Sequence, residues 1–171
     1  MNANKLTQKS LEAVQTAQSL AIEHSNVQIE QEHLVSALLE QPEGLIPALV
    51  KKMGCDLEAL RAALRQRIEG MPGVSGPGRE PDKIYVSQEV DQALVQAEAE
   101  AGRMQDEYVS VEHLLLGLLE RPSAAMREIW SRFGVQKDSF LAALSSVRGN
   151  TRVTSDTPEE TYDALKKYGQ D

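Results

Sequence analysis

The sequence predicts an all-α domain built from two similar halves. Apolar residues recur at spacings of three and four, and no stretch shows the apolar–polar alternation of a half-buried strand. Residues 32–64 match residues 112–144 without a gap, and eleven of the 33 positions are identical. Aromatic residues make up only 4% of the 171-residue chain, so we expect an aliphatic core. These observations predict a pseudo-twofold tandem repeat of two four-helix bundles.

The repeat has a constant offset of 80 residues. Its clearest part is EHLVSALLEQP, which begins at Glu32, and EHLLLGLLERP, which begins at Glu112. Two copies are too few for a solenoid, so we expect one closed domain over residues 1–147. Within it, repeat one covers about 1–69, a joint covers 70–84 and repeat two covers 85–147.

The first two helices of each half are expected to begin at polar caps. The first helix follows an N-cap at Thr7 or Ser87. The second helix covers about 34–39 and its counterpart in repeat two. Ser110 is a good N-cap for that counterpart, whereas Glu30, in the matching place, is a poorer one.

A glycine separates the third helix from the fourth in both halves. Gly54 and Gly134 follow the third helix and suit the left-handed C-cap that glycine adopts without strain. Asp56 opens the fourth helix of repeat one, and Gln136 opens that of repeat two. Each half is therefore expected to hold four helices.

Two stretches interrupt the helical pattern. GMPGVSGPGREPD, from Gly70 to Asp82, has three prolines and four glycines, which exclude a helix. After Val147 the stretch RGNTRVTSDTPEE is polar and aperiodic, so residues 148–171 are predicted to be a linker. Within this linker, TPEETYDALKKY is compatible with a short helix capped by Thr157.

Composition and charge exclude several classes of protein. The net charge of −8 argues against binding to nucleic acid or to an anionic membrane surface, because both partners select basic surfaces. The N-terminus has no apolar stretch of signal-peptide length, and no segment is apolar over a membrane span. The single cysteine, Cys55, cannot form an internal disulfide, so we expect a cytoplasmic protein.

The two Glu-His pairs, at 32–33 and 112–113, allow two interpretations. As a small metal-dependent or acid–base hydrolase, they would have to converge, but neither pair extends to HExxH and neighbours on a helix point about 100° apart. As structure, the glutamates meet the positive end of a helix dipole and the histidines bond a backbone group at the helix start. We favour the structural interpretation and expect no catalytic residue, metal or cofactor on this chain.

Three further features are expected to be structural. Cys55 is replaced by Val135 in the other half, which indicates a small apolar filler. Trp130 matches Val50 and is predicted to lie in the core. The glycine-rich joint lacks the GxxxxGK[ST] pattern and comes after no strand, so it is not a phosphate-binding loop.

The duplicated EHL unit, the start LTQKSLEAVQTAQSLA and the stretch EYVSVEHLLLGLLE resemble the N-terminal domain of Clp-family ATP-driven unfoldases. The joint MPGVSGPG with the IYVSQEVDQAL after it, together with the tail DALKKYGQD, is more similar to ClpB-type disaggregases than to their protease-partnered relatives. The resemblance covers essentially the whole chain and implies a double Clp repeat with four helices in each repeat.

The resemblance also implies a role. The parent proteins of this family are cytoplasmic hexamers that use ATP and Mg to thread aggregated proteins through a central pore, in protein refolding and the heat-stress response. This chain would be the substrate-capture module, binding unfolded or aggregated polypeptide weakly and passing it to the hexamer. It would be monomeric on its own and would depend on separate ATPase modules for activity.

The resemblance implies an apolar substrate groove with polar groups at its edge; the polar residues are carried over by motif, and the apolar residues are our own choice for the groove walls. The polar set comprises Thr7 in LTQK, Asp106 in QDEYVSVEH, Glu112 in the second EHL, and its repeat mate Glu32. The apolar set, expected to form the walls of a groove, comprises Leu11, Leu94 and Tyr108. An alternative is the adaptor- or phosphoarginine-binding N-domain of a protease-partnered Clp unfoldase, in which Glu32 and Glu112 would each clamp one guanidinium.

Overall fold

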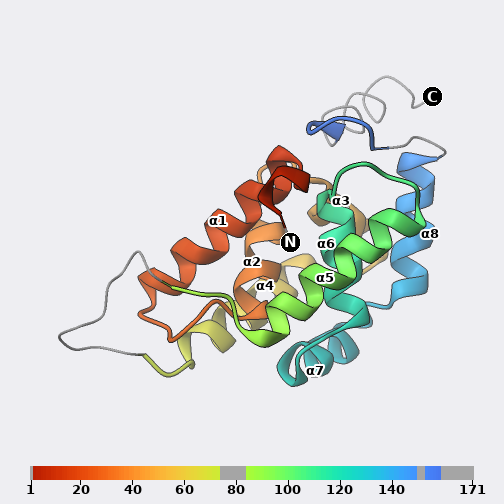
Figure 1. The fold of residues 1–171 in the computed structure, drawn as a ribbon. Helices are drawn as coiled ribbons and strands as arrows, with labels where there is room; N and C mark the ends of the chain where they lie inside the picture. Colours follow the sequence, from red (N-terminus) through yellow and green to blue (C-terminus); the bar gives the residue numbers. More distant parts are fainter. Residues whose placement is uncertain (1, 74–83, 150–152, 159–171) are drawn as a thin grey trace.

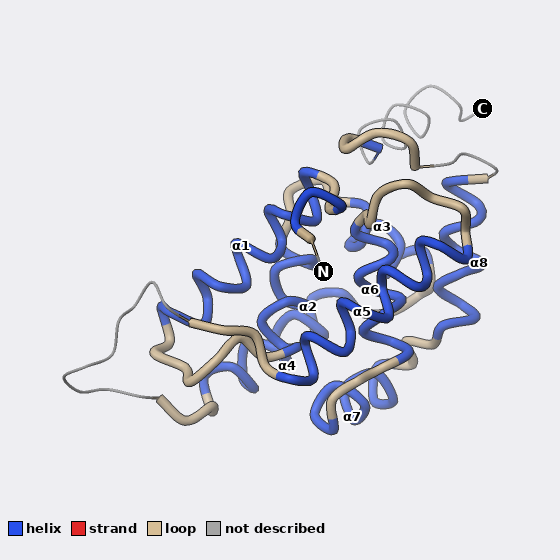
Figure 2. The backbone as a smooth tube through the Cα atoms, viewed as in Figure 1, coloured by secondary structure: helices blue, strands red, loops and turns tan. Residues whose placement is uncertain are grey.

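The computed structural model describes residues 2–73, 84–149 and 153–158. Within these residues the chain forms a 3-10 helix (Ala3–Lys5) and eight α-helices, with isolated bridges in place of any β-strand. The helices, shown in Figures 1 and 2, are α1 (Gln8–Glu23), α2 (Gln31–Glu40), α3 (Leu45–Lys52), α4 (Leu57–Glu69), α5 (Gln88–Arg103), α6 (Val111–Glu120), α7 (Ala124–Phe133) and α8 (Lys137–Arg148). The predicted all-α class is confirmed, with four helices in half one (α1–α4) and four in half two (α5–α8).

The helix boundaries are set by local chemistry. The side-chain oxygens of Thr7, Ser87 and Asp56 each accept a hydrogen bond of 3.1–3.2 Å from the backbone N–H three residues later. These contacts satisfy donors that a helix start leaves unpaired. Gly54 and Gly134 have φ angles of 81° and 68°, so both take the predicted left-handed conformation.

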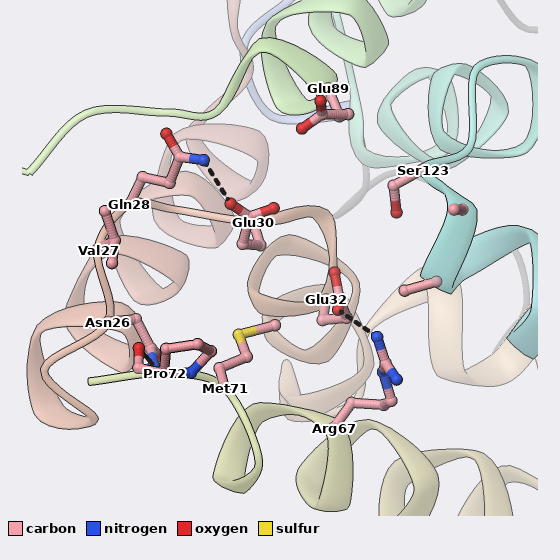
Figure 3. Close-up of a pocket in the computed structure, with 12 residues that line it drawn as sticks. Asn26, Val27, Gln28, Glu30, Glu32, Arg67, Met71, Pro72, Glu89 and Ser123 are labelled. Carbon is pink, nitrogen blue, oxygen red and sulfur yellow. Dashed lines mark hydrogen bonds and ion pairs between the residues drawn. The ribbon is translucent and has the colours of Figure 1, made fainter. Parts of the chain in front are cut away.

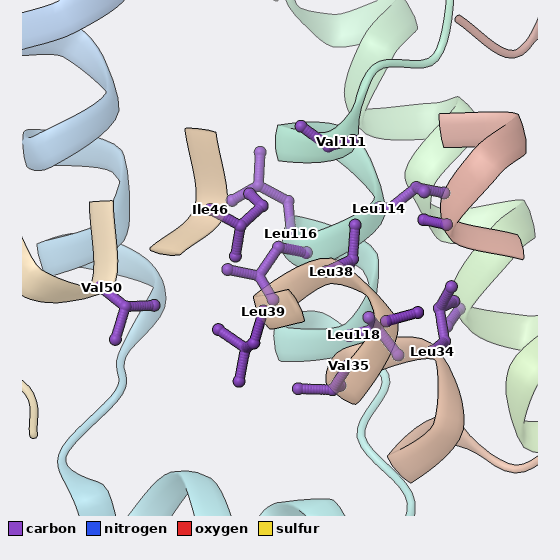
Figure 4. Packing of buried hydrophobic residues seen from close by; sticks show 14 of the residues in the cluster. Leu34, Val35, Leu38, Leu39, Ile46, Val50, Val111, Leu114, Leu116 and Leu118 are labelled. Atoms are coloured by element: carbon purple, nitrogen blue, oxygen red, sulfur yellow. The ribbon is translucent and has the colours of Figure 1, made fainter. Parts of the chain in front are cut away.

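The two sets of four helices share one hydrophobic core. Helices α2 and α6 each have ten residues, and eight residues of each helix are buried. In Figure 4, Leu34 and Leu38 of α2 lie close to Leu114 and Leu118 of α6, and all belong to one buried cluster. Helices that are apolar on nearly all sides belong at the centre of a domain, which explains why neither half is a separate bundle.

Main-chain pairing also interlocks the halves. The segment before α1 pairs with the α5–α6 loop, and the segment before α5 pairs with the α1–α2 loop. The four hydrogen bonds run from Thr7 N to Val109 O (3.0 Å), from Val109 N to Lys5 O (2.8 Å), from Ser87 N to Ile29 O (2.9 Å) and from Ile29 N to Tyr85 O (2.9 Å). Each bond has a counterpart shifted by 80 residues, so the pseudo-twofold symmetry extends to individual atoms.

Several sequence predictions concern the core and the connections. Trp130 is buried as predicted, and its indole N–H donates to Leu118 O at 3.2 Å. Cys55 is half-buried against the core, and burial raises the pKa of its thiol. The predictions for the middle of the joint (74–83) and for most of the tail helix (159–171) lie outside the described residues. No helix in the described ranges is long and apolar enough to cross a membrane.

Gly117 sets the closeness of α6 to α5. A β-carbon at Gly117 would lie 2.2 Å from Ala93 O and 2.9 Å from Ala97 N, both of which are backbone atoms that cannot rotate away. The matching residue in half one is Ala37, so half two has the tighter helix pair.

Gly117→Ala is therefore expected to lower the free energy of unfolding by roughly 1–3 kcal/mol, because α5 and α6 must separate. Urea unfolding monitored by circular dichroism measures this change. Gly102→Ala is the matched control: no atom lies within 4 Å of its new β-carbon, and the substitution should stabilise the helix by about 0.5–1 kcal/mol. Equal stability of the two variants would contradict the packing assigned to Gly117.

Candidate functional site

Both histidines of the EHL repeats hold the start of their own helix. His33 Nδ1 accepts a hydrogen bond from Glu30 N at 2.9 Å, and His113 Nδ1 accepts one from Ser110 N, also at 2.9 Å. Both imidazoles are fully buried. The arrangement is that of a capping box in which histidine replaces the usual Glu or Gln at the third helical position. The predicted structural role of the histidines is confirmed.

The second nitrogen of each imidazole is also bonded. Since Nδ1 accepts, the neutral ring carries its proton on Nε2. His33 Nε2 donates to Asn26 Oδ1 at 2.8 Å, and His113 Nε2 donates to Asp106 Oδ2 at 2.7 Å. With both nitrogens of each ring engaged in hydrogen bonds, neither histidine has a free lone pair for a metal ion. Within the described residues no group of three His, Cys, Asp or Glu side chains could hold a metal ion.

In half two a buried ionic network surrounds the helix start. The Arg148 guanidinium bonds Asp106 Oδ1 and lies 3.4 Å from Glu112 Oε2. Ser110 Oγ donates to the other oxygen of Glu112. The side chains of Asp106 and Glu112 are 0% exposed and that of Arg148 is 3% exposed, so the site is closed.

Asp106 is the centre of this network. Burial by itself would raise its pKa, but the hydrogen bonds from His113, Arg148 and Val153 N outweigh burial and hold the pKa below its ordinary value. Asp106 is therefore an anion that accepts hydrogen bonds from three donors, and these bonds offset the cost of burying its charge.

In half one the equivalent place is an open pocket. Asn26 stands where half two has Asp106, and Ile68 stands where it has Arg148. Glu32 is left with Arg67, whose guanidinium is 3.8 Å away and whose side chain is 52% exposed. The pocket has a volume of about 620 Å³. Its lining residues, shown in Figure 3, are Asn26, Val27, Gln28, Glu30, Glu32, Arg67, Met71, Pro72, Glu89, Ser123, Ala124 and Ala125.

The pocket has an acidic centre. Burial raises the pKa of Glu32, and the charges of Glu30 and Glu89 raise it further, while Arg67 acts in the opposite direction. Burial is also the largest cause of the raised pKa of Glu30, whose carboxylate accepts from Gln28 Nε2 at 2.7 Å. Three carboxylates against one exposed arginine give the pocket an excess of negative charge, which favours cationic groups.

Gln31 holds the far wall of the pocket in place. Its side chain is fully buried between the starts of α5 and α7. Its amide nitrogen donates to Glu89 O at 2.9 Å and to Arg121 O at 2.8 Å, and its amide oxygen accepts from Ser123 N at 2.9 Å. The wall formed by half two is thus fixed to the helix that carries Glu32.

The rim of the pocket is apolar. Val27 lines it and is 61% exposed, and Met71, Pro72 and the first two alanines of α7 lie on other sides. Tyr85, paired through its backbone with Ile29, is 75% exposed. The pocket itself combines negative charge with aliphatic surface, and Tyr85 is not among its lining residues.

The structure separates the residues that the sequence proposed for the site. Of the polar set, Glu32 lines the pocket, whereas Asp106 and Glu112 lie in the closed network of half two. Thr7 is fully buried and its side chain caps α1.

None of the three apolar candidates lines the pocket. Leu11, Leu94 and Tyr108 are all half-buried, and Leu94 packs against the core. Their predicted contacts with a ligand stay predictions.

Sequence reasoning missed Glu30, Glu89 and Arg67 as pocket residues. From the sequence, Glu30 was considered only as the N-cap of a helix. Glu89 lies in the first turn of the fifth helix, just after the joint and far from Glu32 in the chain. The usable signal is the break in the repeat: Arg148 is matched by Ile68 and Asp106 by Asn26, which indicates that the two sites differ.

The interlocked halves and the two histidine-capped helix starts define a double-repeat, all-α domain. The family model of the Clp repeat (R) N-terminal domain matches residues 5–156, and the chain belongs to this family. The chain is 43% identical over 171 residues to the chaperone protein ClpB of Bacillus anthracis. The matched region covers 100% of this chain and 20% of that protein. The chain is also 43% identical over 172 residues to ClpB of Nitratidesulfovibrio vulgaris, with the same two coverages.

The chain thus spans about a fifth of the length of these relatives. The part that it matches is the Clp N-terminal domain, which does not include the ATPase module of those relatives. The predicted family is confirmed.

Solved structures support the fold. The Hsp104 N-terminal domain of Candida albicans has a TM-score of 0.79 and 23% identity, over 91% of this chain and 99% of that one. A ClpV N-domain in complex with a VipB peptide has a TM-score of 0.63 and 19% identity, over 83% of this chain and 88% of that one.

The contacts of His33 predict how stability depends on pH. Burial lowers its pKa from 6.5 to about 4, with His24 adding to the effect. The unfolded chain therefore binds more protons between these two values. The contribution of neutral His33 to stability should be complete above pH 6.5, and at most about 3 kcal/mol of it should be lost as the pH drops toward 4.

Asn26→Asp should raise the pKa of His33, because it places a carboxylate on Nε2 as Asp106 does for His113. NMR titration of the imidazole measures this shift. Val27→Asp adds the same charge at an exposed neighbour and should have a much smaller effect. A His33 pKa that stays near 4 in Asn26→Asp would refute the assignment of this contact.

Proposed function

We propose that this domain captures unfolded or aggregated polypeptide for a ClpB-type disaggregase. The observation that carries the proposal is the open pocket of half one, which joins an acidic centre to an apolar rim. Unfolded chains expose both basic and apolar side chains that folded proteins keep apart or cover. The pocket offers complementary surface for both kinds.

The proposal includes weak binding. A volume of about 620 Å³ holds a few side chains at once, and the ordering of a flexible client offsets much of the gain from contact. Weak binding suits a capture module, because the client must leave the domain for the pore of the hexamer. ATP and Mg, the hexamer itself, the refolding and heat-stress roles and a cytoplasmic location belong to the proposed parent protein.

The comparisons support this proposal at the level of family and fold. The relatives are named as ClpB chaperones, and one domain of the same fold has been solved with a peptide bound.

Glu32→Gln should weaken binding of a basic, permanently unfolded protein, such as reduced and carbamidomethylated lysozyme, by about three- to tenfold. The substitution removes the charge of a buried carboxylate that lines the pocket, where a cation is least screened by water. NMR titration of the ¹⁵N-labelled chain measures the affinity. Binding should also weaken as the pH falls toward the raised pKa values of Glu30 and Glu32, since protonation removes their charge.

Glu128→Gln is the matched control for this titration. It removes the same charge from an exposed position on α7 that does not line the pocket, and it should leave the affinity unchanged. Shifts spread evenly over the surface, or no shift at millimolar protein, would rule out the capture proposal.

A second candidate function is the recognition of phosphorylated arginine. Half two supplies the favouring observation, because its Arg148 guanidinium already occupies the place next to Glu112. Glu32 offers the same carboxylate to a guanidinium from outside. Arg67 and the N-terminus of α7 line the same pocket and provide positive partial charge for a phosphate.

Calorimetry with free phosphoarginine discriminates between the candidates. If the second function is correct, one molecule should bind per chain, because Arg148 closes the mate site at Glu112. Glu32→Ala should abolish the heat of binding. A stoichiometry of two would show that the closed network opens, and the absence of heat in the unchanged protein would exclude this function.

A further inference from the structure

Residues 153–158 lie against the start of α1 and the α5–α6 loop, although they come after the last helix. Glu107 N donates to Val153 O at 2.8 Å, and Val153 N donates to Asp106 Oδ1 at 2.9 Å. Three residues later, Gln8 N donates to Asp156 O at 2.8 Å, and Gln8 Nε2 lies 3.3 Å from Asp156 Oδ2. In Figure 1 this short segment, in dark blue, lies beside the first turns of the chain, in dark red.

The surface recognises this segment mainly through its backbone. Three of the four hydrogen bonds use main-chain atoms of the segment, so they do not depend on its side chains. One side chain of the segment does matter: Val153 is 0% exposed and acts as an aliphatic anchor. Backbone pairing with one buried side chain is the way in which a surface binds extended peptides of many sequences.

The attachment of the segment is light. Residues 154–156 between its two ends are exposed, and only Val153 and Pro158 are buried. Asp106 would keep its bonds to His113 and Arg148 if the segment left. The docked and undocked states therefore differ by a few hydrogen bonds and two small side chains.

We propose that this surface, formed by Gln8, Asp106 and Glu107, is a second binding site for extended polypeptide, which residues 153–158 occupy until a client displaces them. The inference rests on the proposed capture function and adds a site to it. The ligand is an unfolded chain that presents a small aliphatic residue in place of Val153. The open pocket at Glu32 and this surface would then contact different parts of one client.

Displacement couples capture to the linker. In this position residues 153–158 are held against the domain, whereas displacement releases these residues and lengthens the linker. Client binding and the lengthening of the tether are one event.

Two changes to the segment test the proposal in opposite directions. Val153→Asp puts a charge in the buried anchor position and should release the segment. Gln8→Cys with Asp156→Cys, joined by a short bifunctional thiol reagent, should hold it in place. Cys55→Val removes the native thiol from the second variant, as Val135 does in the other half.

The probe is reduced and carbamidomethylated lysozyme, titrated by NMR. If docking holds the surface closed about nine-tenths of the time, release should tighten binding about tenfold. The crosslinked chain should bind more weakly than the unlinked one, and in the unchanged protein the Val153 methyl signals should move to random-coil positions as the probe is added. Ser145→Asp, an exposed charge on α8, is the control and should bind like the unchanged protein.

Each outcome decides the proposal. Equal affinity of the crosslinked and unchanged chains, with Val153 docked at saturation, overturns the displacement site and leaves the capture function standing. No binding to any variant overturns both. Should Val153→Asp fail to fold, the crosslinked chain and the Val153 signals still give the answer.

Discussion

The hydrogen bond from a backbone N–H to histidine Nδ1 at the start of α2 and α6 is the contact on which most of this domain depends. It fixes the first turn of the two central helices, whose apolar sides form the shared core. It also fixes the tautomer, so Nε2 must donate to the residue seven positions earlier in the chain. The glutamate beside each histidine is thereby held at the boundary between core and surface.

The same frame gives two different sites because few residues differ. Where Asp106 and Arg148 are present, the Glu112 carboxylate is paired with the Arg148 guanidinium inside the protein, and the site is closed. Where Asn26 and Ile68 replace them, Glu32 lines a pocket and its nearest cation is the exposed Arg67. The two halves therefore share the histidine-capped helix starts and differ in the cation that lies beside the glutamate.

The sequence was sufficient for the fold because the fold depends on local and periodic signals. Thr7, Ser87 and the two C-cap glycines act on their own neighbours, and the 80-residue offset makes the symmetry visible. The site was only partly predictable. Glu32 was found by its motif, but the burial of Asp106 and Glu112 depends on Arg148, which enters from the last helix. Contacts between residues so far apart in the chain produce no periodic pattern in a single sequence. The one trace they leave here is the break in the repeat, where Arg148 is matched by Ile68.

The central claim is that half two carries its own cation in a closed site, whereas the matching site of half one is open. Guanidinium NMR of ¹⁵N-arginine-labelled protein tests it most directly, because rotation about Cζ and hydrogen exchange report whether a guanidinium is held. The account predicts hindered rotation and slow exchange for Arg148, and free rotation with fast exchange for Arg67. An Arg148 guanidinium as free as that of Arg67 would contradict it.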